Sequence, residues 1–294
     1  MRRPPCAITS GFLFPGGFAT LTAMSAPENS FAWEPITPRG VVAFAHGTVR
    51  RLWIVQLLAA IFVAVSVLWF FNDSCAPAIE KAIRSLSGNG EIHSGELAWH
   101  GDAPAVLAEE RVLGFDIDLN HTGQIHCTSD VQIEFGRDSI RVFSLLGYAD
   151  FYYPYNPPDQ IIPVSREDLE PLWGAWLAEI RAVLLAVIIV GLMLVWNVLA
   201  TIYWVPVWLL GFFARRELGF LASWRLAGAS LLPGALLLAL AFFFYDFGVL
   251  DLVQFSFVVC AHLLLGWLYL FVGLLFLPRH AATPAKKNPF EAEK

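Results

Sequence analysis

Long runs of apolar residues alternate along the chain with segments of mixed polarity. Three of these runs, at residues 52–71, 226–245 and 252–277, contain no Asp, Glu, Lys or Arg. A helix needs about 20 mainly apolar residues to cross a hydrocarbon core roughly 30 Å thick. The pattern therefore predicts a transmembrane helix in each run.

A fourth apolar stretch, at residues 182–213, does not have the length of a simple crossing. At a rise of about 1.5 Å per residue it is too long for one untilted helix and too short for two. We interpret it as a span over about 182–202 and an interfacial segment over 203–213. Pro206 is expected to bend the chain there, and Trp204 and Trp208 are typical of the membrane interface.

Between the first and second spans the pattern changes to a period of two. Phe115, Ile117 and Leu119 alternate with polar residues, and similar alternation occurs at 96–100, 131–135 and 140–145. This pattern predicts a small antiparallel sheet of five to seven strands with one face in water. We also expect a short helix over 76–86, an aromatic loop over 148–158, and a helix that begins with a capping box at Ser165 and Asp168.

Composition supports a membrane protein, and charge orients it. The chain is 57% hydrophobic and 15% charged, with a mean hydropathy of +0.59. With four crossings, 12 of the 19 Lys and Arg residues flank the spans on one side. Basic flanking segments resist translocation, so both termini are predicted to be cytoplasmic. The predicted location is the inner (cell) membrane, as a multi-pass protein.

The segment between the first two spans, residues 72–180, is strongly acidic. It holds 18 of the 25 acidic residues and 6 basic ones, a formal balance of −12. Nucleic acid and anionic headgroups would be repelled by such a domain. Basic proteins, cations and neutral partners are compatible with it.

These observations give a fold class and a division into domains. The fold is predicted to be membrane α-helical, with about four transmembrane helices and an inserted, small, antiparallel β-rich extracytoplasmic domain. The expected segments are a disordered tail (1–36), an interfacial helix and first span (37–71), the β-rich domain (72–180), a C-terminal transmembrane cluster (181–278) and a disordered tail (279–294). Residues 1–23 have two interpretations. They resemble a signal peptide, with Arg2 and Arg3 before an apolar region, or they precede a true start at Met24. The second is favoured, because Pro15, Gly16 and Gly17 interrupt the apolar region and no good cleavage site follows it.

The start of the second segment has a good helix signal. Thr37 and Pro38 fit the N-cap and first helical position. The interfacial helix that follows is expected to turn Val41, Phe44 and Ala45 toward lipid.

Cysteine and histidine are the candidate site residues of the β-rich domain. Cys75 and Cys127 are expected outside, where two thiols form one bridge or remain unpaired. Four histidines (His93, His100, His121 and His126) fall in the same domain, but their spacings match no zinc pattern. We expect neither a metal nor another cofactor.

Polar residues inside the spans are candidates for function because they are costly in lipid. Gln56, Asn197, Thr201 and Ser230 are expected at a similar depth, and His262 lies in the fourth span. Hydrogen bonds between helices explain such residues more simply than a transport path does. A Ser230–His262 hydrolytic dyad is disfavoured because the two differ in depth.

The layout resembles that of bacterial polytopic membrane proteins of unknown function. The resemblance lies in the architecture and in GEIHSGELAWHG, LGFDIDLN and SDVQIEFGRDSIRVFSLLGY. Such proteins carry one N-terminal span, an extracytoplasmic β-rich domain and a C-terminal helical cluster. The resemblance implies a bacterial source and no catalytic residues.

The function expected from these features is non-enzymatic. The outer domain would bind or sense an envelope protein or another extracytoplasmic ligand, while the helices sit in the lipid bilayer. The alternative is a transporter or channel subunit that uses the intramembrane polar residues.

A reporter fused after Lys294 tests the topology. Four crossings leave residue 294 in the cytoplasm, so fused alkaline phosphatase should be inactive and fused green fluorescent protein should fluoresce. A fusion within residues 72–180 is the control and should behave in the opposite way. Active phosphatase at residue 294 would favour five spans, which place Arg279, Lys286 and Lys287 outside.

Overall fold

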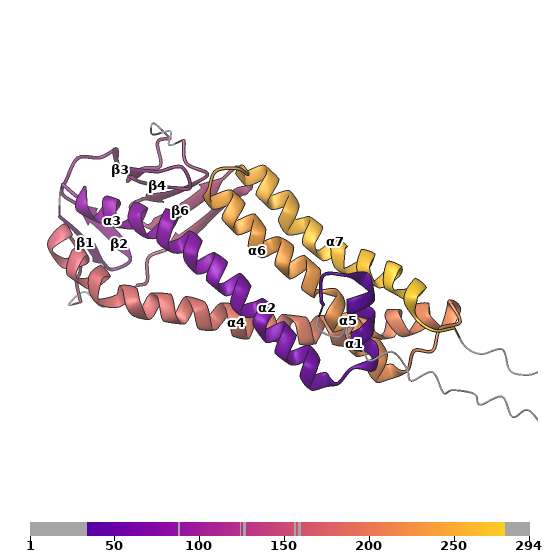
Figure 1. Cartoon of the computed structure of the whole chain (residues 1–294). Helices are drawn as coiled ribbons and strands as arrows, with labels where there is room; N and C mark the ends of the chain where they lie inside the picture. Colours follow the sequence, from indigo (N-terminus) through magenta and orange to yellow (C-terminus); the bar gives the residue numbers. More distant parts are fainter. Residues whose placement is uncertain are drawn as a thin grey trace, which may run out of the picture. The chain divides into compact units, whose positions relative to one another are not determined.

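The computed structural model describes residues 34–279, apart from residues 88, 124, 126, 127, 156, 158 and 159. The described part begins with α1 (Pro38–His46) and α2 (Val49–Phe70). A π-helical turn, η2 (Phe71–Cys75), joins α2 to α3 (Ala76–Arg84) without a break (Figure 1). The predicted first span and the predicted short helix after it are therefore one helical run.

The second half of the chain is helical. It comprises α4 (Arg166–Phe213), α5 (Phe220–Ser230), α6 (Leu232–Asp246) and α7 (Leu252–Phe276). The helical runs Val49–Arg84, Arg166–Phe213, Phe220–Asp246 and Leu252–Phe276 are long and apolar enough to cross a membrane. These four runs agree with the spans expected from the sequence.

Helix α4 differs from the predicted arrangement at its C-terminal end. Pro206 lies inside the helix, and residues 203–213 continue α4 instead of forming a separate segment after a bend. A proline removes one backbone hydrogen bond, but a long apolar helix tolerates this loss where neighbouring helices pack against it. Val207 and Gly211 are buried just after the proline, which supplies that packing.

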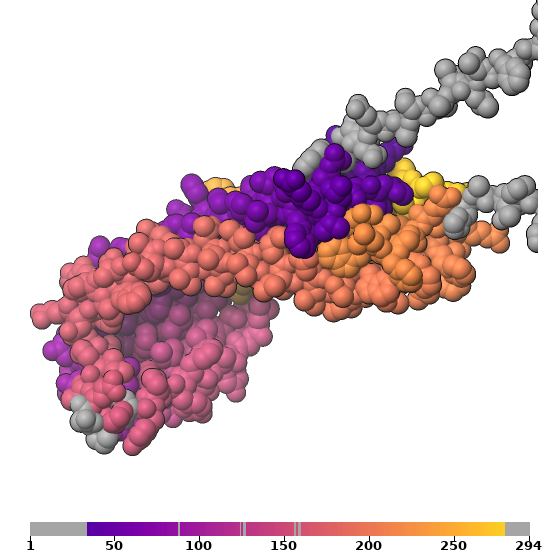
Figure 2. All heavy atoms as spheres, turned by 90° about the horizontal axis from the view of Figure 1, so that it is seen from below, coloured from indigo at the N-terminus to yellow at the C-terminus, as the bar shows by residue number. Residues whose placement is uncertain are grey.

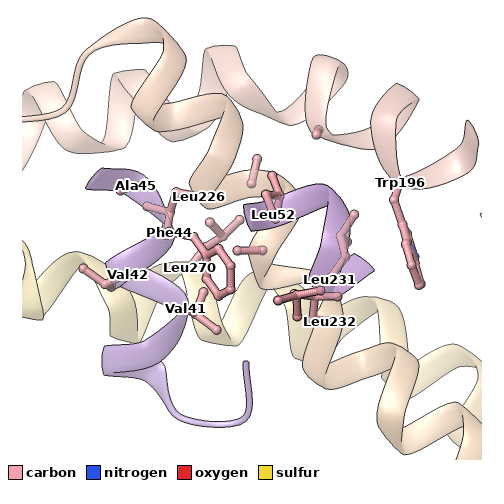
Figure 3. Packing of buried hydrophobic residues seen from close by; sticks show 14 of the residues in the cluster. Val41, Val42, Phe44, Ala45, Leu52, Trp196, Leu226, Leu231, Leu232 and Leu270 are labelled. Atoms are coloured by element: carbon pink, nitrogen blue, oxygen red, sulfur yellow. The ribbon is translucent and has the colours of Figure 1, made fainter. Parts of the chain in front are cut away.

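Helix α1 forms where it was expected, but its apolar face points the other way. Thr37 caps it by accepting a hydrogen bond from the Gly40 N–H at 3.0 Å. Val41, Phe44 and Ala45 were expected to face lipid, and this was wrong, because they are buried in the cluster that Leu226 and Leu270 share (Figure 3). Burial against protein removes the same apolar area from water. The Arg225 guanidinium also donates a 2.7 Å bond to the Ala45 carbonyl.

Small residues allow the helices to approach closely. Ala59 and Ala60 of α2 and Ala235 and Ala239 of α6 are buried in the same cluster. At Gly234, a Cβ atom would overlap the carbonyl oxygen of His262 on α7. Close backbone approach at small residues is the usual basis of helix association in lipid.

Eight strands in two sheets form the rest of the described chain. A three-stranded antiparallel sheet has the order β2-β1-β8, from β1 (Gly90–His93), β2 (Glu96–Trp99) and β8 (Ile162–Val164). The other sheet has the order β3-β4-β5-β6-β7, from β3 (Ala105–Glu109), β4 (Leu113–Ile117), β5 (Val131–Phe135), β6 (Ser139–Ser144) and β7 (Gly147–Tyr152). We call residues 76–165, which include α3 and both sheets, the β-domain.

Two features of the sheets differ from the prediction. Strands β4 and β5 are parallel, because the chain crosses over between Ile117 and Val131 and does not turn back in a hairpin. Residues 148–152 were expected in a loop but form most of β7, which pairs antiparallel with β6. The aromatic residues there fit a strand well, and the loop begins only after Tyr152.

Replacing Gly234 with Ala should separate α6 from α7. The new methyl group meets the His262 backbone, which cannot move as a flexible side chain does. We expect a loss of about 1–3 kcal/mol, typical of overpacking, and a lower melting temperature for the full chain in detergent. Gly191→Ala is the matched control, because a Cβ at position 191 of α4 meets nothing within 4 Å. The interpretation fails if both variants melt like the wild type.

Candidate functional site

The β-domain contains an apolar cavity of about 350 Å³. It lies between the two sheets, with α3 on one side and the first turn of α4 on another. The lining residues come from all of these elements: Ile79, Ala82, Ile83, Leu86, Ile92, Leu97, Trp99, Leu107, Phe115, Ile117, Phe135, Ile140, Tyr153, Pro154, Val164 and Leu169.

The cavity exists because the apolar face of the larger sheet is only partly covered. Alternation places Phe115, Ile117, Phe135 and Ile140 on this face. Helix α3 packs its small residues, Ala78 and Ala82, over β3 and β4. Helix α3 contacts β3 and β4 more extensively than β6 or β7, so the half of the face toward β6 and β7 is less covered by it. Figure 2 shows the surface hollowed between the outer part of α4 and the strands.

Two lining residues, Trp99 and Tyr153, have polar side-chain atoms, and both donate hydrogen bonds to backbone carbonyls. The Trp99 indole N–H donates to the Asp102 carbonyl at 3.1 Å, and the Tyr153 hydroxyl donates to the Gly136 carbonyl at 3.1 Å. Burial, helped by the nearby Asp138, raises the pKa of Tyr153 above its ordinary value. Tyr153 therefore stays neutral at physiological pH, and these polar atoms are already bonded within the protein.

The opposite face of the larger sheet carries a row of ionisable residues. The strand register aligns Asp116 of β4 with Glu134 of β5, Glu134 with Arg141 of β6, and Arg141 with Asp150 of β7. Arg141 donates to Asp150 at 2.8 Å, and this bond, more than simple attraction, lowers the pKa of Asp150. The row thus runs from a buried end at Asp116 to a more exposed end at Asp150.

The buried end of the row corrects the prediction of a wet face. Asp116, Asp118, Gln132 and Glu134 are each at most 5% exposed. The alternation correctly separated polar from apolar positions, but an alternating pattern cannot show which residues cover each face of the sheet. Here His121, from the connection between β4 and β5, contacts the Glu134 carboxylate through its Nδ1 atom.

Asp116 and Asp118 respond to this burial in opposite ways. Desolvation dominates at Asp116 and raises its pKa to about 6, although Gln132 donates a 2.8 Å bond to it. Its second carboxylate oxygen is buried without a protein partner among the described residues. Burial would also raise the pKa of Asp118, but hydrogen bonds from Thr122, Asn120 and Gly123 outweigh it, and the net shift is downward.

A polar junction, which was not predicted from the sequence, joins the β-domain to the helices. Arg111, just before β4, donates to the backbone carbonyls of Tyr245 and Asp246 at 2.5 and 3.0 Å. The Tyr245 hydroxyl in turn donates to Asp130 at 2.8 Å. Asp246 accepts a 2.6 Å bond from Ser74 of η2. A cation at the C-terminal end of α6 also interacts favourably with the helix dipole.

Two of the intramembrane candidates bond to another helix, and both reach α5. The Gln56 Nε2 donates to the Gly228 carbonyl at 3.3 Å. The Thr201 hydroxyl accepts from the Trp224 indole N–H at 3.1 Å. These bonds hold α2 and α4 against α5, which is the role expected of polar packing residues.

The remaining intramembrane candidates are not gathered into one site. Asn197, Ser230 and His262 bond to carbonyls of their own helices, those of Met193, Ala227 and Val259. Their polar atoms are largely satisfied locally, as buried polar groups require.

The cysteine and histidine candidates are only partly described. Cys75 ends η2, whereas Cys127 and His126 lie outside the described residues, so the disulfide stays a prediction. His93, His100 and His121 occupy separate positions in the β-domain. Within the described residues, no group of three or more His, Cys, Asp or Glu side chains is placed to hold a metal ion.

Replacing Asp116 with Asn should stabilise the chain at pH 7 and weaken its pH dependence. The folded-state pKa is near 6. It lies above the unfolded value of about 4, so the folded state binds more protons in this window. Stability from this group is complete below about pH 4 and is lost as the pH rises through about 6. The asparagine side chain keeps an acceptor for Gln132 and carries no charge, so we expect a gain on the order of 1–2 kcal/mol at pH 7.

Thermal unfolding of the purified full chain at pH 5 and pH 7 measures this effect. Asp150→Asn, at the other end of the same row, is the matched control and should not stabilise at pH 7, because it removes the partner of Arg141. Equal pH profiles for the wild type and Asp116→Asn would contradict the assignment.

Comparison with known proteins returns nothing similar: no family model, curated protein or solved structure matches the chain, and the resemblance in layout noted from the sequence remains a prediction.

Proposed function

We propose that the chain is a multi-pass membrane protein of the cell envelope whose β-domain binds an apolar ligand of the acyl-chain type on the outer side. The helical runs provide the membrane placement, since four of them are long and apolar enough to cross. The apolar cavity is the observation that carries the binding role.

The distribution of charge supports the orientation. The described basic residues Arg39, Arg216 and Arg225 lie at the end of the helices where α1, α5 and the end of α7 meet. The acidic β-domain lies at the other end, beyond Phe70 and Tyr245. With basic flanks retained inside, this arrangement favours cytoplasmic termini and an inner-membrane location.

The chemistry of the cavity favours a hydrocarbon chain over a polar ligand. Ligand sites commonly have volumes of about 300–1000 Å³. A cavity of about 350 Å³ is therefore large enough for a small ligand or part of a larger one. Its lining offers carbon atoms, and the polar atoms of Trp99 and Tyr153 are used by backbone carbonyls. A buried polar ligand group would lack partners, which is costly.

The position of the cavity favours a ligand from the bilayer. Leu169 of α4 lines it, and α4 continues from there along the apolar run that is long enough to cross. Residues 182–195 of α4 are all apolar, and Val183, Val187, Val190 and Leu194 among them are exposed, so this part of the helix has an apolar surface for lipid. A chain that leaves the outer leaflet along α4 would pass Glu179 and Arg181 at the end of the apolar run and then meet Trp176, Leu172 and Leu169.

A helix that lines the cavity is continuous with a membrane-spanning run, so ligand binding could change the position of that run. Helix α3 carries Ala82 and Ile83 into the cavity lining and continues through η2 into α2. A π-helical turn in such a run often marks a functional site, because its backbone bonds are less regular. A ligand that displaces α3 would therefore act on α2 directly, which is consistent with a sensor.

No specific observation favours the alternative of a transporter or channel subunit. Most of the polar residues that such a function would use bond within their own helices. Gln56 and Thr201 instead stabilise the contacts of α2 and α4 with α5.

Crosslinking with a diazirine fatty acid tests the proposed function. In nanodiscs containing the full chain, the wild type should give adducts on peptides from α3 and β4 as well as on α4. Ala82→Phe fills the cavity from α3 and should lower the adducts on α3 and β4 about ten-fold, equivalent to ~1.4 kcal/mol, while adducts on residues 183–195 stay unchanged.

Ala98→Phe is the matched control, because it adds the same atoms at an exposed position of β2 that does not line the cavity. It should crosslink like the wild type. The proposal is wrong if the wild type gives adducts only on the transmembrane helices, or if Ala82→Phe and Ala98→Phe behave alike.

A further inference from the structure

The turn between β6 and β7 has an unusual composition for its geometry. Ser144 pairs with Gly147, so the two residues between them, Leu145 and Leu146, form the tip. Two-residue hairpin loops usually hold Asn, Asp or Gly, which suit the backbone and face water. Leu145 and Leu146 are 78% and 69% exposed, and Tyr148 beside them is 74% exposed.

Strand register shows which way this tip points. Val131 at the start of β5 is level with Leu113 at the start of β4 and with Ser144 at the end of β6. Val112, next to Leu113, packs with Tyr245 and Leu252. Tyr245 lies in the last turn of α6, and Leu252 is the first residue of α7. The tip therefore lies at the end of the strands that faces the α6–α7 turn.

The tip also lies to the side of the helices. Strand β6 is two strands away from β4, the strand next to the junction. Two strand spacings amount to roughly 10 Å. The α6–α7 turn at the same level exposes two further apolar residues, Phe247 and Val249, at 64% and 66%. Apolar side chains thus occur at one level on both the hairpin and the helical turn.

We propose that Leu145 and Leu146 insert into the outer leaflet of the bilayer that the chain crosses, with Tyr148 at the headgroup level. This inference rests on the membrane placement in the proposed function and not on the cavity. Leucine gains free energy in the acyl region, and tyrosine is enriched at the interface. The acidic domain would oppose anionic headgroups, so the partner is a neutral or zwitterionic lipid surface.

Depth measurements with a nitroxide label test the insertion. The label is attached to a single cysteine at position 146, 138 or 194, with the native cysteines replaced by serine, in phosphatidylcholine vesicles. Position 138 is the matched control, since it lies in the β5–β6 turn at the opposite end of β6. At the usual rise of a strand, the length of β6 separates the two labels by roughly 20 Å. Position 194 lies on the exposed apolar surface of α4 and reports membrane embedding.

The label at 146 should collide more often with oxygen than with a water-soluble nickel complex, as at 194, and the label at 138 should show the reverse. If 146 behaves like 138 while 194 is embedded, the insertion is wrong and the membrane placement stands. Strong spin–spin broadening at 146 in dilute samples would instead mean contact with a second copy, which also overturns the proposal.

A second measurement keeps the native cysteines and so does not depend on the folding of the cysteine-free chain. With p-benzoylphenylalanine at 146, illumination in the same vesicles should produce an adduct with the mass of phosphatidylcholine. An adduct at 194 with none at 146 would contradict the insertion. Neither readout involves the cavity, so failure here and failure of fatty-acid crosslinking are distinguishable.

Discussion

The bonds from Arg111 to the end of α6 fix the larger sheet against the helices, in addition to the continuous helical run from α2 to α3. The guanidinium supplies two donors to carbonyls. Carbonyls in the last turn of a helix lack a partner within the helix. The Tyr245 carbonyl also accepts from the Gly248 N–H at 3.1 Å. The guanidinium also lies over the Tyr245 ring and 3.9 Å from Asp130. Because β4 begins two residues later, this contact sets the position of the larger sheet, and with it the cavity and the β6–β7 turn.

The apolar contact beside Arg111 makes the junction specific. Val112 is buried in one cluster with Tyr245 of α6 and Leu252 of α7, and Phe70 of α2 packs against the same cluster. Charge alone would leave the orientation loose, since exposed ion pairs contribute little. Directed bonds to backbone carbonyls combined with buried apolar area restrict both the distance and the rotation of the sheet.

Sequence reasoning recovered the features that depend on local pattern. The four apolar helical runs, the caps at Thr37 and Ser165 and the apolar positions of β4 and β5 all follow from hydrophobicity and local hydrogen bonding. The burial of Phe44 and Asp116 could not be predicted in this way, because a periodic pattern gives a face without naming what covers it. The same limit applies to the candidate site: the cavity lining comes from residues as far apart as Ile79 and Leu169, and Arg111 finds its partners more than 130 positions away.

The two faces of the larger sheet serve different physical purposes. On one face, α3 covers β3 and β4 with alanines, which leaves an apolar volume that larger side chains would have filled. On the other, the buried carboxylates are held by Gln132, His121 and backbone amides, at a cost in desolvation that the raised pKa of Asp116 records. Protein interiors are normally packed without such space, so an empty apolar face beside a costly polar one is poorly explained by stability alone. The proposed binding of an apolar ligand would account for both faces together, since the polar network lies behind the same strands as the cavity.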